Sequence, residues 1–374
     1  MKTLVSLVSD QTLPNLQLII EFKNQVNEFW FFHSQRTKQE VDWIINAANL
    51  SKEQTFTINI EPFNIYQINE VLQKLNIDDR DFIVNITGGT KLWIMVLFEF
   101  FKNLGAEIYY VTGIDKNVVK VFPNKGKREF KLMCDINLNE HLQVYGVEFK
   151  LHKPKNEFKI AQNIYKYFLK VPTEKKHEIS QIIYQERIAL RKNYNKTPEE
   201  LGEPIVEFLK TIEYPTQDGC LKYKDVKYLT GEWLEEYVYY KIKSELNLDD
   251  HHIAAGLQIR KKEVPNELDV AFVYNHQLYV IECKTSIKEV HRMPGGSIKE
   301  RSVLGDVIYK SDSLRPKFGL FAKSSIIVLS ELRDENLNPL DEFKNNFRRA
   351  ELSNIKIISK RQLQATDQLS SLII

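Results

Sequence analysis

The chain has 374 residues, 43% of them hydrophobic, which is enough for two globular domains and a connecting segment. Its formal net charge is only +2, so any contact with nucleic acid has to come from local basic patches. Cys134, Cys220 and Cys283 are far apart and form no CxxC pair, which argues against a disulfide framework or a structural zinc site and favours a reducing cytoplasm.

No segment predicts a membrane span. The most hydrophobic run, LWIMVLFEFF at 92–101, is too short to cross a bilayer and contains Glu99. The first nine residues predict a strand rather than a signal peptide. We therefore expect a cytoplasmic protein without a membrane partner.

Residues 1–148 alternate between strand and helix patterns. This alternation predicts a parallel sheet with helices on both faces. The expected strands are 2–9, 28–34, 56–60, 81–86, 107–113 and 117–122, and the expected helices are 15–25, 37–50, 65–75 and 91–103.

After residue 148 the pattern changes twice. Residues 149–226 are helical and rich in lysine, and we interpret them as a connector whose lysines lie on solvated helix faces. Residues 227–374 then form a further domain. Its expected elements are a helix at 231–246, a strand at 253–260, a hairpin within 267–286, a helix at 303–314 and a strand at 324–330.

The hairpin ELDVAFVYNHQLYVIECKTS, residues 267–286, carries charges where a sheet usually has apolar residues. Successive side chains of a strand alternate between faces, and a two-residue turn at 275–276 places Asp269 opposite Glu282. Like charges in that position destabilise a sheet. A divalent cation with oxygen ligands would neutralise them, with Lys284 one step further along the same face. A three-residue loop would break this register.

Two other residue types near the hairpin suggest ordinary structural roles. The Cys283 side chain points away from the charged face, which favours a buried structural cysteine over a nucleophile. His276 and the neighbouring histidines lack a metal-ligand spacing such as HExxH, so we expect loop or surface positions for them.

The order of elements from about residue 227 to residue 335, with Asp269 on the second strand and Glu282-Cys283-Lys284 on the third, resembles the PD-(D/E)XK nuclease superfamily. The resemblance implies that Asp269 and Glu282 bind Mg²⁺ or Mn²⁺ together with the backbone carbonyl of Cys283. It also implies that Lys284 positions or helps to activate the attacking water and stabilises the charge that develops on the phosphoryl group.

The helix before these strands supplies a further acid in this superfamily. Its sequence GEWLEEYV is similar to the Gly-x-x-(Leu/Phe)-Glu-x-x-Val pattern of Mrr-like members at Gly231, Leu234, Glu235 and Val238. The resemblance makes Glu235 the expected additional catalytic residue. Glu236 remains an alternative, because both glutamates border the apolar stripe of the helix.

A glycine-rich turn, Thr-Gly-Gly-Thr-Lys at 87–91, joins an expected strand to an expected helix. Glycines permit a tight turn there, and the free N–H groups at a helix start attract phosphate. The turn is neither a Walker A sequence nor GxGxxG, which argues against an ordinary NTPase or dinucleotide enzyme. The first strand-to-helix loop, residues 8–15, lies at the same carboxyl edge of the predicted sheet, where ligands bind in such folds.

These two loops resemble those of the CRISPR-associated Rossmann fold (CARF) sensor domain, with Asn85 through Lys91 fitting its N-x-T-G-G-T-K loop. The resemblance implies a cyclic oligoadenylate, cyclic tetra-adenylate first, bound across the two-fold axis of a homodimer. The residues expected to bind it are Ser9, Asp10, Gln11, Thr12, Asn15, Asn85, Thr87, Gly88, Gly89, Thr90 and Lys91.

Together the two halves resemble the ancillary nucleases of type III CRISPR antiviral systems, and the fold class expected is α/β: a Rossmann-like CARF domain, a helical connector and a restriction-endonuclease-like domain. Such a protein is a ligand-activated, metal-dependent endonuclease. The sequence leaves the substrate open among single-stranded DNA, RNA and nicked duplex DNA. Two alternatives also stay open: a constitutive restriction or repair nuclease, and a ligand-responsive regulator with a silent nuclease site.

Overall fold

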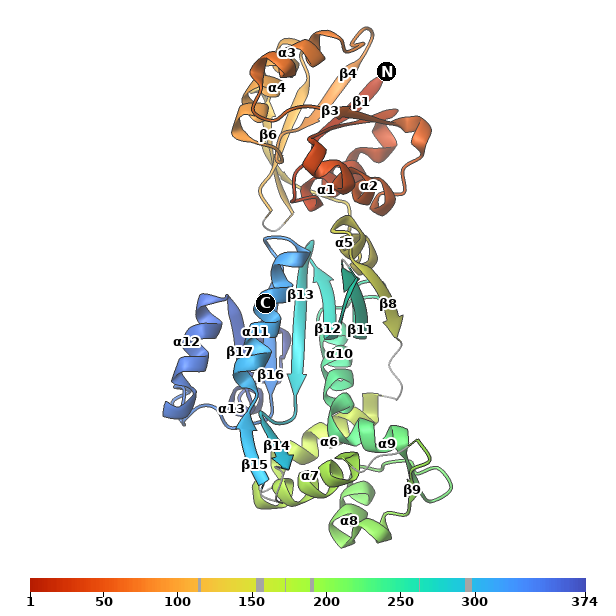
Figure 1. Ribbon diagram of the computed structural model, residues 1–374, viewed down its shortest axis with the longest axis vertical. Helices are drawn as coiled ribbons and strands as arrows, with labels where there is room; N and C mark the ends of the chain where they lie inside the picture. Colours follow the sequence, from red (N-terminus) through yellow and green to blue (C-terminus); the bar gives the residue numbers. More distant parts are fainter. Residues whose placement is uncertain (114–115, 153–157, 172, 189–191, 262, 293–297) are drawn as a thin grey trace.

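The computed structural model describes residues 1–374 except 114–115, 153–157, 172, 189–191, 262 and 293–297. It is an elongated α/β molecule in which two sheets lie end to end (Figure 1). The N-terminal sheet and its helices form one end, and a group of helices from the middle of the chain forms the other. The second sheet lies between them.

The N-terminal sheet has seven strands in the order β3-β2-β1-β4-β5-β6-β7. The first five run parallel, as predicted, and the last two are antiparallel, because the short link from β5 to β6 leaves no room for a crossover helix. The strands are β1 (Lys2–Leu7), β2 (Glu28–His33), β3 (Thr55–Asn59), β4 (Asp81–Asn85), β5 (Glu107–Val111), β6 (Asn117–Phe122) and β7 (Glu129–Lys131).

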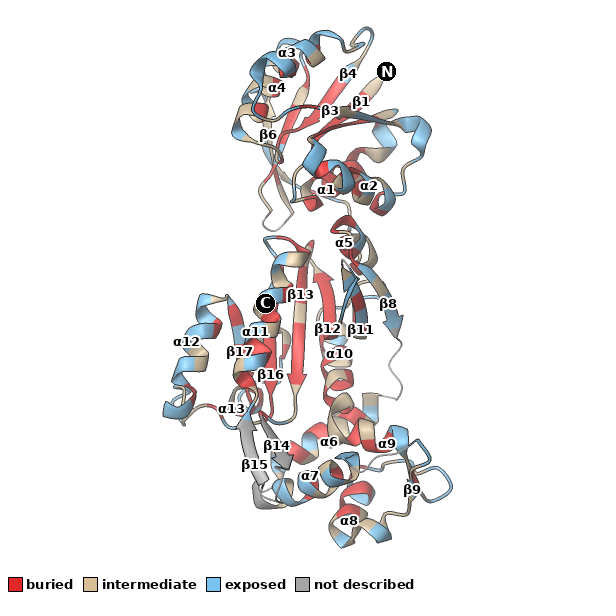
Figure 2. Cartoon of the chain, in the orientation of Figure 1, coloured by how far each residue is buried: buried red, intermediate tan, exposed pale blue. Residues whose placement is uncertain are grey.

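Helices cover both faces of this sheet, so its central strands are buried on both sides (Figure 2). Leu4 and Val5, neighbours on β1, are both fully buried and belong to different hydrophobic clusters. Continuous apolar strands of this kind are typical of parallel sheets. One face carries α1 (Leu13–Phe22) and α2 (Lys38–Ala47), and the other carries α3 (Ile65–Gln73) and α4 (Lys91–Asn103).

The second sheet has six strands in the order β17-β16-β13-β12-β11-β8. Both edge strands were absent from the sequence-based prediction, and β8 lies where the helical connector was expected to begin. The chain therefore enters the second sheet before it forms the connector helices. The strands are β8 (Glu148–His152), β11 (Ile253–Lys261), β12 (Val264–Tyr274), β13 (Gln277–Lys284), β16 (Lys323–Val328) and β17 (Ile355–Ser359).

Helices pack on both faces of the second sheet as well. On one face lie α6 (Phe158–Lys170) and α10 (Trp233–Glu245), the latter preceded by a π-helical turn, η5 (Tyr228–Glu232). The other helices are α5 (Leu138–Val144), α7 (Thr173–Ile188), α8 (Glu203–Thr211), α9 (Tyr223–Lys227), α11 (Leu304–Leu314), α12 (Lys344–Leu352), α13 (Lys360–Gln364) and α14 (Ser370–Ile373). Two small ribbons pair β9 (Asn195–Lys196) with β10 (Leu221–Lys222) and β14 (Lys288–Arg292) with β15 (Ile298–Ser302).

The hairpin of β12 and β13 has the predicted two-residue turn. Asn275 and His276 both have positive φ, 50° and 64°, as a tight hairpin turn with the right-handed twist of its strands requires. The strands pair in the predicted register, from Tyr274 with Gln277 to Val270 with Ile281. The predicted register is thus confirmed from Tyr274 to Val270, and Asp269 and Glu282 come one step beyond the last of these pairs.

His276 lies in the turn of this hairpin, as the expected loop position allows, but its side chain is buried against the N-terminal domain rather than on the surface, while Asn275 is exposed. His276 is 2% exposed, and burial lowers its pKa to about 4, so its ring is neutral. Its Nε2 lies 3.0 Å from the carbonyl of Cys134, which can only accept, so Nε2 carries the proton. Its Nδ1 therefore accepts from Nε2 of Gln17 on α1, also at 3.0 Å. A second link is the hydrogen bond from the Leu320 N–H to Oε1 of Gln11.

Candidate active site and ligand-binding loops

The predicted charged residues of the hairpin meet at the end of β13. Nζ of Lys284 lies 2.7 Å from Oε1 of Glu282 and 3.4 Å from Oδ2 of Asp269. The N–H of Cys283 donates to the same oxygen of Asp269 at 2.7 Å. Because Lys284 contacts both carboxylates, they share one side of the sheet. Both are buried, and charges in such a setting are poorly screened.

Lys310 is a further member of this cluster that the sequence analysis missed. It extends from α11, and its Nζ lies 3.0 and 2.9 Å from the two carboxylate oxygens of Glu282. The spacing of apolar residues predicted α11 itself, but nothing in the sequence says how this helix lies across the sheet. A lysine on a helix is usually solvated, so no signal distinguished this one.

Glu235 and Glu236 have different surroundings, although they are adjacent on α10. Glu235 is partly buried, and burial, followed by the charge of Asp269, raises the pKa of its carboxyl group far above the ordinary range. Glu236 is buried and accepts a hydrogen bond from the Tyr228 hydroxyl at 2.6 Å. Glu236 therefore has a structural partner, which favours Glu235 as the additional acid.

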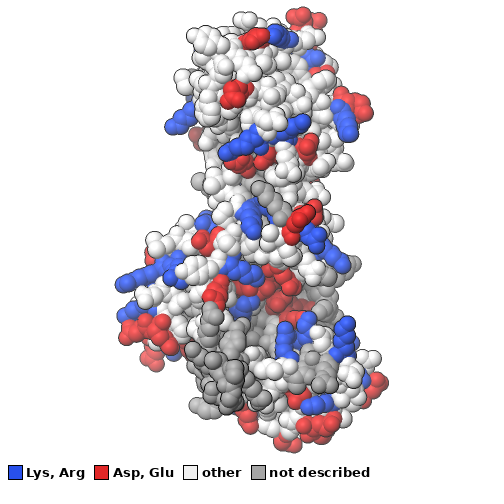
Figure 3. Space-filling model, in the orientation of Figure 1, with Lys and Arg blue, Asp and Glu red and all other residues white. Residues whose placement is uncertain are grey.

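The cluster is held together by opposite charges in a hollow of the surface. Figure 3 shows acidic side chains gathered in this hollow, over the lower part of β12 and α10, with Lys and Arg side chains around it. Burial, and next the charge of Glu282, raise the pKa of Asp269. Burial alone would lower the pKa of Lys284, but Asp269 and Glu282 outweigh it and raise that pKa, so Lys284 stays an ammonium.

The donor atoms of this cluster suit a hard divalent cation. Within the described ranges, no three His, Cys, Asp or Glu side chains form a ready-made metal cluster, and Glu282 pairs with Lys284 and Lys310. Asp269 and Glu282 nevertheless present buried carboxylate oxygens on one side of the sheet, and carboxylate and carbonyl oxygens are the ligands that Mg²⁺ and Mn²⁺ prefer. The two lysines supply the compensating charge that buried carboxylates require.

The two predicted ligand-binding loops lie against each other at the carboxyl ends of β1 and β4. A Cβ built on Gly88 would lie 2.3 Å from the carbonyl oxygen of Leu7 and 3.1 Å from Oγ of Ser9. Only glycine allows this close approach. Thr90 caps α4 by accepting a hydrogen bond from the Trp93 N–H. The glycine turn therefore presents the start of α4 beside the first loop.

Several of the predicted ligand-binding residues brace these loops from inside. Nδ2 of Asn85 donates to Oδ1 of Asn15 at 2.8 Å, and the hydroxyl of Thr87 donates to Oδ1 of Asn85 at 2.6 Å. The Val111 N–H in turn donates to Oγ1 of Thr87. Thr12 is fully buried and donates to a backbone carbonyl of α5. The remaining predicted residues, Ser9, Asp10, Gln11, Gly89, Thr90 and Lys91, are partly or fully exposed.

Fold and site together define a Rossmann-like sensor domain joined to a restriction-endonuclease-like domain with an acid–lysine cluster. Residues 3–141 match the family of the Card1 CARF domain, and residues 222–365 match the Card1-like endonuclease domain. The chain therefore joins a CARF domain of the Card1 type to a Card1-like endonuclease domain.

Two solved structures share this fold over the whole chain. Can2 from Sulfobacillus thermosulfidooxidans, in complex with cyclic tetra-adenylate (cA4), is 20% identical with a TM-score of 0.73, and the match covers 100% of both chains. Protein VC1899 from Vibrio cholerae is 17% identical with a TM-score of 0.73, covering 99% of this chain and 98% of its own. At this identity the likeness establishes the fold alone. None of the curated proteins matches the sequence.

In the part of the chain that the structure describes, every helix is too short or too polar to cross a membrane.

The electrostatics of the cluster predict a pH dependence of stability without added metal. The raised pKa values of Glu235 and Asp269 mean that the folded state holds protons more tightly than the unfolded state. Their contribution to stability is complete at about pH 4 and is lost as the pH rises through the raised values. Unfolding midpoints at about pH 5 and about pH 8, measured in EDTA, should therefore fall with pH, and Glu235→Gln should reduce the fall. Glu203→Gln, an exposed carboxylate on α8, should keep the wild-type slope; an equal slope for Glu235→Gln would contradict the assignment.

Proposed function

We propose that the protein is a metal-dependent nuclease of type III CRISPR antiviral defence, activated by a cyclic oligoadenylate and acting on DNA or RNA phosphodiester bonds in the cytoplasm. One observation supports this most directly. The hairpin that carries Asp269 and Glu282 reaches from the acid–lysine cluster to the sensor domain, where His276 of its turn is buried and contacts Gln17. The proposed catalytic residues and the contact with the sensor domain thus lie on the same β-hairpin.

Asp269, Glu282 and the backbone carbonyl of Cys283 would hold Mg²⁺ or Mn²⁺. When bound, the cation polarises the phosphodiester and lowers the pKa of a coordinated water. The donor chemistry of the buried carboxylates supports this assignment, and so does the fact that they now depend on ammonium groups for neutralisation.

The other members of the cluster act on the substrate and on the charge balance. Lys284, kept as an ammonium by two carboxylates, orients the attacking water and stabilises the charge developing on the phosphoryl oxygens. Glu235, beside Asp269, is the expected additional acid of the site. Lys310 gives Glu282 a second counter-charge.

The two loops of the N-terminal domain would bind cyclic tetra-adenylate. The complex of Can2 with this ligand supports the choice, as does the exposed Lys91 at the start of α4, where backbone N–H groups favour phosphate. The ring would lie across the two-fold axis of a homodimer and contact the same loops of both protomers.

Activation would pass through the joint at the hairpin tip. Gln17 lies on α1, directly after the first ligand-binding loop, and contacts His276. Gln11, within that loop, accepts from the Leu320 N–H ahead of β16. A ligand that prefers one position of this loop therefore favours one position of the nuclease sheet, as coupling by differential affinity requires.

Substitutions in the cluster should separate cleavage from ligand binding. Glu282→Gln and Lys284→Ala should lower kcat/KM for an oligonucleotide by at least roughly 100- to 1,000-fold, because each removes charge that acts in the transition state. Affinity for cyclic tetra-adenylate, measured by calorimetry, should stay at the wild-type value. Lys323→Ala, an exposed lysine at the opposite end of the sheet, is the control. Cleavage by Glu282→Gln at the wild-type rate would refute the site.

Substitutions in the sensor should have the reverse effect. Lys91→Ala should raise the concentration of cyclic tetra-adenylate needed for half-maximal activation by roughly 5- to 150-fold, the range of one charge-assisted contact to phosphate. The rate at saturating ligand should be kept. Lys102→Ala, at a partly exposed lysine on the last turn of α4, should change neither quantity. Activation at unchanged concentrations would place the ligand elsewhere.

Gln17→Ala tests the joint between the domains. Removing the amide leaves Nδ1 of His276 buried without its donor and should loosen the hairpin tip. The ratio of the activated to the ligand-free cleavage rate should fall by roughly 2- to 30-fold, the size of a coupling change at one contact. Gln25→Ala, exposed beyond the end of α1, should leave the ratio unchanged. A wild-type ratio in Gln17→Ala would exclude this route.

A further inference from the structure

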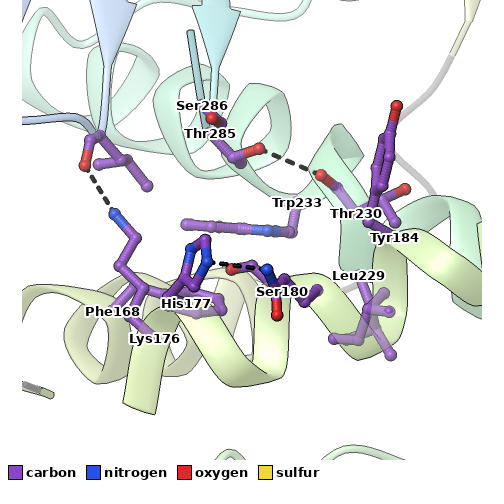
Figure 4. Close-up of a pocket in the computed structure, with 13 residues that line it drawn as sticks. Phe168, Lys176, His177, Ser180, Tyr184, Leu229, Thr230, Trp233, Thr285 and Ser286 are labelled. Atoms are coloured by element: carbon purple, nitrogen blue, oxygen red, sulfur yellow. Dashed lines mark hydrogen bonds between the residues drawn. The ribbon is translucent and has the colours of Figure 1, made fainter. Parts of the chain in front are cut away.

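A cavity of about 180 Å³ lies between α7 and the residues that follow β13 (Figure 4). From α7 it is lined by His177, Ser180 and Gln181, all exposed side chains. The facing wall contains residues 285–286, which directly follow Lys284 in the chain. None of these lining residues belongs to the proposed metal or ligand sites.

Hydrogen bonds fix this cavity to the catalytic end of the sheet. The Leu329 N–H donates to the carbonyl of Lys284, and Nζ of Lys176 donates to the carbonyl of Leu329 at 2.6 Å. On the other side, the hydroxyl of Thr285 donates to the carbonyl of Thr230 at 3.1 Å, as Figure 4 shows. The cavity wall begins at Thr285, whose Cα lies about 3.8 Å from that of Lys284 across one peptide bond.

The size of the cavity suits a single planar ring system. An engineered protein cavity of about 150 Å³ binds benzene, whereas pockets for drug-sized ligands measure roughly 300–1,000 Å³. A volume of about 180 Å³ is therefore too small for a cyclic tetranucleotide. It is large enough for one ring slightly bigger than benzene.

The chemistry of the lining matches a nucleobase attached to a polyanion. Among the described residues no Asp or Glu lines the cavity, so this part of the lining has no negative charge to repel phosphate. Its inner wall contains Phe168 and Trp233, stacked on each other with centroids 5.6 Å apart, and the buried indole N–H of Trp233 has no hydrogen-bond partner among the described residues. The side chains of Ser180 and Gln181 both donate and accept hydrogen bonds, as the edges of bases require.

We propose that this cavity binds one base of the strand being cut, next to the scissile phosphodiester, and so selects where cleavage occurs. The inference rests on the proposed nuclease function and adds a specificity site to it. The base enters beside Lys284, its ring lies between α7 and the end of β13, and Gln181 contacts its edge. The competing explanation is that the cavity is an empty gap between packed helices.

The test uses the full-length protein with cyclic tetra-adenylate and Mn²⁺, and oligonucleotides of DNA and of RNA that each lack one base at a successive position around the cut. In the wild type, loss of the base at one position should lower kcat/KM by roughly 5- to 150-fold, the value of one stacked base. Ser180→Trp, which fills the cavity, should abolish this position-specific penalty, and Gln181→Ala should alter which base is preferred there. Gln185→Trp adds the same ring to an exposed position of α7 outside the cavity and should keep the wild-type profile.

The outcomes separate this inference from the proposed function. Cleavage without any position-specific penalty, or an unchanged penalty in Ser180→Trp, would overturn the base-binding cavity and leave the nuclease intact. No cleavage by the wild type under any of these conditions would overturn the proposed function and the cavity with it. Unfolding midpoints of both tryptophan variants establish that they are folded before the profiles are compared.

Discussion

The repulsion between two buried carboxylates, and its neutralisation, is the constraint on which the rest of the nuclease domain depends. Asp269 and Glu282 are brought to one side of the sheet by the register of a single hairpin, and the low dielectric of the interior strengthens their repulsion. Lys284 reaches both, and Lys310 approaches Glu282 from α11. Keeping these buried charges costs electrostatic free energy. A purely structural sheet would have valine or isoleucine at the same positions.

The same hairpin connects this charged cluster to the sensor domain. Lys284 is the last of the eight residues of β13 and His276 directly precedes the strand, so the two are roughly 25 Å apart at the rise of a strand. Paired strands on both sides make β13 stiff, so movement at one end is transmitted rather than absorbed. The contacts of Gln17 and Gln11 place this stiff element next to the loops at which a ligand of the sensor would act.

Local sequence patterns predicted the elements and the hairpin, but not the contacts between distant segments. Alternation and a two-residue turn sufficed to place Asp269 and Glu282 together, because strand geometry is nearly invariant. Lys310 and His276 were missed for the opposite reason: their surroundings are set by how a helix crosses a sheet and how two domains meet. The edge strand β8 was missed because its sequence, EFKLH, directly precedes a long helical stretch, even though its residues alternate as in a strand. Adjacent Glu235 and Glu236 could be distinguished only by their partners in space.

The burial of His276 in the β12–β13 turn limits how this protein can vary and be engineered. Hairpin tips are usually the places where chains accept inserted residues, affinity tags or proteolytic nicks without harm. Here both turn residues have left-handed backbone conformations, and one of them fills a space between two domains. A single added residue would displace the ring of His276 and also move one carboxylate to the other face of the sheet. Two constraints therefore fix the length of this turn. One is the space between the domains that His276 fills, and the other is the strand register that keeps both carboxylates on one face of the sheet.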